Sequence, residues 1–200
     1  MSTGLFMGIR GSYTEDGRDL ADTLLKEIND VLVANGLAAY VDPDPPPNVY
    51  AGHLFGRSAL DHHSSRVLRD IADRATTRSK NSANLALIRD NPYRVVFVPA
   101  KLQRPCETEY QERIAGSMVA IWVGSLDGLL EELAWLADDL AIPIEDGQIS
   151  DRTAAAINDY QPFRDGDSVE LVEDWRTAWL ALYEGARLAK EVSVALTLAG

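Results

Sequence analysis

Residues Ser117–Leu140 read SMVAIWVGSLDGLLEELAWLADDL, and this stretch decides the expected fold. The apolar run Met118–Val123 is rich in β-forming residues, which predicts a strand buried on both faces. Gly124-Ser125 breaks the run, and Ser125 can accept a hydrogen bond from the free N–H groups at a helix start. Leucine and alanine side chains then recur at helical spacing as far as Leu140. The sequence therefore predicts an amphipathic helix packed on the strand.

The turn between this strand and this helix has an alternative interpretation as a phosphate site. A helix N-terminus attracts anions, and Gly124–Gly128 occupies that place. The segment lacks the lysine and the glycine spacing of a P-loop, and its own carboxylates would repel a phosphate unless a cation intervened. We interpret it as an ordinary strand-to-helix turn and keep a nucleotide-binding enzyme as an alternative.

Further apolar patterns surround the central unit. Val95–Val98 predicts a second buried strand. Because the loop Ala100–Tyr110 contains no strong helix pattern, we expect this strand to pair antiparallel with Met118–Val123. Terminal strands are expected at Leu5–Ile9 and Val192–Leu198, and helices from Arg18 to Ala34 and at Ser64–Ala75, Asp151–Asn158 and Asp174–Lys190. The expected fold class is α+β (or α/β), with a small, mainly antiparallel sheet covered by amphipathic helices.

Two segments lack a core-forming pattern. Residues 42–60 begin DPDPPPN, which predicts a proline-rich surface connector. Residues 76–83, TTRSKNSA, are polar and are expected to form a mobile loop. No repeat or second domain is evident, so residues 1–200 are assigned to a single domain.

The charge balance is strongly acidic. The chain carries 31 acidic and 19 basic residues, giving a formal net charge of −12. This excess opposes binding to nucleic acid and to anionic membranes, and it favours a basic protein partner. Cys106 is the single cysteine, so an internal disulfide is excluded. No apolar span reaches the roughly 20 residues that cross a bilayer, and no secretory signal pattern opens the chain, so we expect a cytoplasmic protein.

The triplet Asp61-His62-His63 resembles the motif of the DHH phosphoesterases, in which Asp and His ligate divalent metals. The resemblance implies a metal-dependent phosphoesterase with these three residues as ligands. A metal site needs several ligands that converge, and no apolar strand leads into this triplet. We therefore interpret the triplet as polar residues at a helix start, expect no cofactor, and keep the metal enzyme as an alternative.

A second resemblance covers Gly116–Gly147. It is carried by Gly124-Ser125, Leu129-Leu130, Glu132-Leu133, Leu136-Ala137, Leu140, Ile142-Pro143 and Asp146-Gly147, with Val98-Pro99 and Pro105 upstream. In these residues the chain resembles an uncharacterised bacterial family of immunity-type proteins. The resemblance implies a non-catalytic protein that neutralises a polymorphic toxin, and it implies no catalytic residues.

These observations lead to one functional hypothesis. We predict a non-catalytic acidic binding protein, most concretely an immunity-type inhibitor that binds a basic toxin domain. Negative charge would steer association with a cationic site that itself binds nucleic acid. Self-association as a homodimer is a further alternative. The candidate partner-facing residues are Glu131, Glu132, Asp138 and Asp139 in the central helix, and Asp42, Asp44 and Tyr50 in the connector.

Overall fold

The computed structural model describes residues 4–44, 62–78, 82–91, 94–114, 116–159 and 171–199. Five strands and six α-helices are assigned within these ranges, together with two short 3-10 helices. In chain order they are β1 (Gly4–Met7), η1 (Arg10–Ser12), η2 (Glu15–Gly17), α1 (Arg18–Ala34), α2 (His62–Arg78), α3 (Ala83–Asp90), β2 (Arg94–Val98), β3 (Cys106–Ile114), β4 (Ser117–Ser125), α4 (Leu126–Asp139), α5 (Asp151–Asn158), α6 (Leu171–Glu191) and β5 (Leu196–Ala199).

The five strands form one mixed sheet in the order β1-β5-β2-β4-β3. Three of its four strand pairs are antiparallel, and the pair β2–β4 is parallel. The predicted α+β fold class with a mainly antiparallel sheet is therefore confirmed.

The predicted antiparallel pairing of the two central strands is wrong. Val95 lies beside Trp122 and Val98 beside Ser125, so both strands run in the same direction. Parallel neighbours need a long connection between them, and residues 99–116 supply it. Part of that connection, which we expected to be a loop, is the edge strand β3, and it pairs antiparallel with the outer side of β4.

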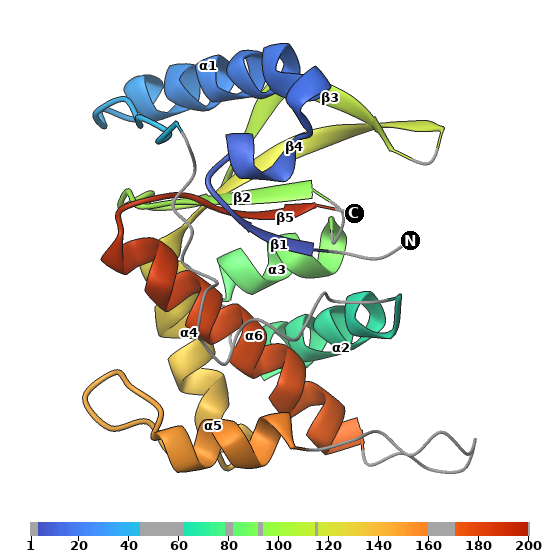
Figure 1. Ribbon diagram of the computed structural model, residues 1–200, viewed down its shortest axis with the longest axis vertical. Coiled ribbons are helices and arrows are strands. Elements are labelled where there is room, and N and C mark those ends of the chain that lie inside the picture. Colours follow the sequence, from blue (N-terminus) through green and yellow to red (C-terminus); the bar gives the residue numbers. More distant parts are fainter. Residues whose placement is uncertain are drawn as a thin grey trace.

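Helices cover both faces of the sheet, because the central strand is apolar on both sides. All five residues of β2 are buried. One core lies between the sheet and α1, and the other lies between the sheet and the layer formed by α2, α3, α4 and α6. Figure 1 shows α1 alone on one side and these four helices on the other, with α5 beyond them.

The central strand–helix unit forms as the sequence predicts. The Ser125 side chain accepts a hydrogen bond from the Gly128 N–H and caps α4. Leu126, Leu129 and Leu133 are fully buried on the inner face of the helix. Ser150 caps α5 in the same way, by accepting from the Thr153 N–H. Local capping and helical spacing therefore fixed both helix starts.

The long helix α6 fills the larger core. Trp179 is fully buried, stacks on Tyr183 with ring centroids 4.7 Å apart, and donates its indole N–H to the Leu133 carbonyl at 2.8 Å. Trp179 therefore belongs to the core between α4 and α6. Within the described part of the chain, no helix combines the length and the apolar character that a membrane crossing requires.

The two segments without a core-forming pattern are described only in part. In the connector, Asp42 is buried, and residues 45–60 lie outside the described ranges. In the expected mobile loop, Thr76–Arg78 complete α2 and Ala83 begins α3, while residues 79–81 lie outside the described ranges. Helix α3 itself was not predicted from the sequence.

Candidate functional site: an acidic surface

Acidic side chains are concentrated in one part of the chain. Residues 127–159 include nine acidic residues and a single basic one, Arg152. Residues 57–100, by contrast, include four acidic and eight basic residues. The acidic excess therefore falls on α4, on α5 and on the turn that joins them.

Six carboxylates of this segment are exposed. Their side chains form no hydrogen bond or ion pair with any residue that the structure describes. In Figure 1 the turn and α5 lie at the opposite end of the molecule from α1, and α4 runs toward them. We call these six residues the acidic surface: Glu131, Asp138, Glu145, Asp146, Asp151 and Asp159.

The outward face of α4 has a defined spacing of charge. With 3.6 residues per turn, Glu131 and Asp138 point away from the buried leucines of this helix. They are seven residues apart, which is about 10 Å along the helix axis at 1.5 Å per residue. Between them lies Trp135, whose side chain is 42% exposed. This face therefore presents two carboxylates that flank an aromatic ring.

Glu132, one of the predicted partner-facing residues, points into the protein instead. Its carboxylate accepts hydrogen bonds from the backbone N–H of Asn84 at 2.9 Å, the Asn84 side-chain amide at 2.8 Å and the Leu85 N–H at 2.7 Å. These donors lie at the start of α3, where backbone N–H groups lack helical partners. Burial raises the pKa of Glu132 above its ordinary value of 4.5, and the three N–H donors oppose that shift. Glu132 therefore joins α4 to α3.

Glu132→Gln is expected to lower the free energy of unfolding by about 1–3 kcal/mol, because the new amide group faces N–H donors. The pH dependence should change too. A raised pKa means that the folded state holds the proton more tightly, so this group's contribution to stability is lost as pH rises from 4.5 through the folded pKa. Urea unfolding of wild type, Glu132→Gln and the exposed control Glu131→Gln between about pH 4 and 7 measures both effects. The same pH slope in all three proteins would contradict this assignment.

The other predicted partner-facing residues that the structure describes are buried or paired with a basic side chain. Asp139 lies 3.8 Å from Arg74 of α2, and Asp44 lies 3.6 Å from Arg18 of α1. Tyr50 lies outside the described residues. Of the predicted residues that the structure describes, Glu131 and Asp138 lie together on the outward face of α4.

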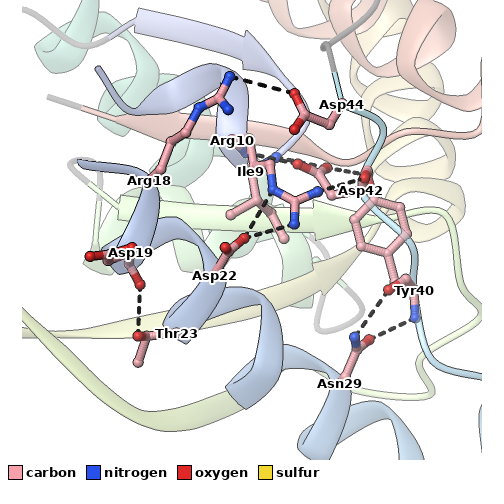
Figure 2. A network of polar contacts seen from close by, with 10 residues as sticks. All are labelled: Ile9, Arg10, Arg18, Asp19, Asp22, Thr23, Asn29, Tyr40, Asp42 and Asp44. Atoms are coloured by element: carbon pink, nitrogen blue, oxygen red, sulfur yellow. Dashed lines mark hydrogen bonds and ion pairs between the residues drawn. The ribbon is translucent and has the colours of Figure 1, made fainter. Parts of the chain in front are cut away.

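Asp42 is buried and serves as an internal acceptor. Its carboxylate accepts hydrogen bonds from the backbone N–H groups of Ile9 and Arg10, at 2.9 and 2.8 Å, and from the Tyr40 hydroxyl at 2.6 Å. Figure 2 shows this network, with Arg10 also bound to Asp22. Gly8 has φ +79°, and a Cβ there would lie 2.9 Å from the carboxylate. This carboxylate holds the connector against the end of β1.

The start of α4, the alternative nucleotide site, is occupied by protein groups. The Asn84 side-chain oxygen accepts a hydrogen bond from the Ser125 N–H at 2.9 Å. A Cβ at Gly128 would lie 2.4 Å from the Asn84 amide nitrogen. The Ser125 hydroxyl donates to the Ala100 carbonyl at 2.8 Å. Asn84 therefore fills the space that a phosphate would need, and the glycines allow this close approach.

The alternative metal site lies mostly beyond the described structure. Asp61 is outside the described residues, and His62 and His63 form the first turn of α2, with side chains that are not described. Among the residues that the structure does describe, no group of three or more His, Cys, Asp or Glu side chains is arranged to hold a metal.

One comparison with known proteins identifies a family. Residues 57–198 match the model of a family described as "Putative DNA-mimic protein", and the match covers well over half of the chain. The chain belongs to this family. The DNA-mimic match includes all six residues of the acidic surface and excludes α1. No curated protein and no solved structure matches the chain.

Membership of the DNA-mimic family agrees with the prediction of an acidic protein that binds a protein partner. The description of the family names no toxin, so an immunity role stays a proposal. Sequence reasoning missed four members of the acidic surface, namely Glu145, Asp146, Asp151 and Asp159. A count of acidic against basic residues in each segment would have found them, because their density is visible in the sequence.

Proposed function

We propose that the protein is a non-catalytic inhibitor that occupies the nucleic-acid-binding surface of a basic protein. The acidic surface is the observation that carries this proposal, because it presents six exposed carboxylates that no described side chain neutralises. Arginine and lysine side chains that bind phosphates also bind carboxylates, since both are anions with hydrogen-bond-accepting oxygens. A surface with this chemistry can replace a stretch of nucleic acid.

The spacing of charge on α4 is compatible with this role. Phosphates of one DNA strand follow each other every 3.4 Å or so along the duplex axis. Measured along the two helix axes, the rise of roughly 10 Å from Glu131 to Asp138 equals the rise of about three phosphate steps. A helix of this kind offers rigid positions for charge, and a rigid surface loses less conformational entropy on binding.

A more specific form of the proposal is that the partner is a toxin. A toxin domain that acts on nucleic acid carries the cationic site that such a surface would fill, so an immunity-type inhibitor in the cytoplasm is the role we favour. Electrostatic steering would speed capture of the toxin, because opposite charges raise the association rate. In this form the inhibitor works by exclusion and needs no cofactor.

The test is a pull-down with the tagged full chain at about 50 mM and about 500 mM salt, since screening weakens contacts between exposed charges. We expect a basic partner at low salt that is released at high salt and by added duplex DNA. Poly-glutamate of equal charge concentration is the control, and it should displace less partner. A partner that DNA does not displace would overturn the mimicry, and a DNA-displaceable partner without toxin activity would overturn only the immunity role.

A further inference from the structure

Among the residues that the structure describes, two intramolecular sites combine an aromatic ring, a guanidinium group and a carboxylate. Arg94 lies over the Tyr13 ring, with its guanidinium carbon 4.4 Å from the centroid, and its Nε lies 3.0 Å from Glu112. Arg74 lies over the Trp175 ring at 5.0 Å, and its Nε lies 3.8 Å from Asp139. In each site the ring contacts one face of the guanidinium and the carboxylate neutralises its charge.

The outward face of α4 has two of these three components. Trp135 is an exposed aromatic ring, Glu131 precedes it by four residues, and Asp138 follows it by three. Side chains at these separations are neighbours on a helix surface, with Cβ atoms about 5–6 Å apart. No described basic side chain pairs with either carboxylate. The guanidinium is the missing component.

We propose that Trp135, Glu131 and Asp138 form a docking site for an arginine side chain of the partner protein. This inference rests on the proposed function and deepens it, because it assigns an anchor within the acidic surface. Charge complementarity selects a cation, and the ring selects arginine over lysine. The flat guanidinium can stack on an indole and donate two parallel hydrogen bonds to a carboxylate, whereas an ammonium is a compact, strongly hydrated charge.

The arginine in question is one that would otherwise contact nucleic acid. Arginine side chains bind phosphates and stack on bases, and α4 offers a substitute for each contact in the same place. Exposed tryptophans surrounded by polar residues are also enriched among the residues that dominate binding energy at protein interfaces. The docking site therefore supplies specificity within a surface whose remaining carboxylates supply long-range attraction.

The test uses two probes of equal charge, hepta-arginine and hepta-lysine, titrated into the full chain and followed by calorimetry and by the NMR signals of the indole N–H groups. Hepta-arginine is expected to bind about 3–5-fold more tightly than hepta-lysine, because an exposed cation–π contact adds affinity of this size. The Trp135 indole signal should shift more with arginine than with lysine. Trp135→Leu should reduce the affinity ratio to about one while preserving hepta-lysine binding, and Trp135→Tyr should keep most of the ratio.

Leu20→Ala is the matched control, because Leu20 is 51% exposed on α1 and also follows an acidic residue by four positions. It should leave the ratio unchanged. An unchanged ratio in Trp135→Leu, or equal binding of the two peptides to wild type, would overturn the docking site. A partner captured and displaced by DNA as strongly with Trp135→Leu as with wild type would also overturn it, and would leave the proposed function intact.

Discussion

Neutralising four carboxylates of the acidic surface, with the substitutions Glu131→Gln, Asp138→Asn, Glu145→Gln and Asp146→Asn, is expected to weaken partner binding about 100-fold. Each change removes a charge and keeps the shape of the side chain. A loss of about 0.7 kcal/mol per exposed charge, typical of interface-rim contacts in water, accounts for this factor. The association rate should fall more than the dissociation rate rises, because exposed charges act mainly through steering. Surface plasmon resonance with the captured partner at several salt concentrations measures both rates.

A matched variant separates local charge from total charge. Glu15→Gln, Asp16→Asn, Glu107→Gln and Glu109→Gln neutralise four exposed carboxylates of η2 and β3, outside the acidic surface. Both variants change the net charge by the same amount. If the acidic surface is the binding site, the control keeps nearly all of its affinity. Equal losses in the two variants would show that only the overall field of the protein matters.

The elements α4, α5 and β2 could be predicted because the sequence of each contains its own local signal. Buried leucines at helical spacing and a serine cap define α4, and a serine cap with the buried residues Ala154 and Ile157 defines α5. The run of β-forming residues in β2, which is buried at all five positions, also predicts its strand from local sequence alone. Elements of this kind need no information from distant residues.

Strand pairing could not be predicted, because it depends on contacts across the chain. The edge strand β3 contains CETEYQERI, whose charged residues suit an exposed edge and conceal the strand in a search for apolar runs. Once β3 is assigned to a loop, β2 and β4 become consecutive strands, and an antiparallel pair is the natural inference. Helix α3 could not be predicted either, because the side chain that accepts from its first N–H groups is Glu132, 48 residues further along the chain.

The candidate site was predicted only in part, because contacts between distant residues decide which carboxylates face solvent. Glu131 and Glu132 are adjacent and chemically identical, yet one faces solvent and the other accepts three hydrogen bonds from the start of α3. The angular position of Glu131 opposite the leucines could have separated the two. For Asp42 no such signal existed, because its donors come from Ile9, Arg10 and Tyr40, brought together only by the fold.

Asp42→Ala is expected to reduce the free energy of unfolding by about 3–5 kcal/mol, the usual cost of breaking a buried charged network. The substitution leaves the Ile9 N–H without an acceptor in the core, and it removes the acceptor of the Tyr40 hydroxyl. For a chain of this length, such a loss lowers the melting temperature by about 10 °C. Thermal unfolding followed by circular dichroism measures the change.

Asp44→Ala is the internal control for this prediction. Asp44 is the same residue type two positions further on, but its side chain is 48% exposed and its ion pair with Arg18 spans 3.6 Å. An exposed pair of this kind contributes at most about 1 kcal/mol, so the control should lower the melting temperature by no more than a few degrees. If the two variants unfold at the same temperature, Asp42 is not the residue that holds the connector against β1. A large difference would show that some carboxylates of this acidic chain are required for folding and do not contribute exposed charge to the acidic surface.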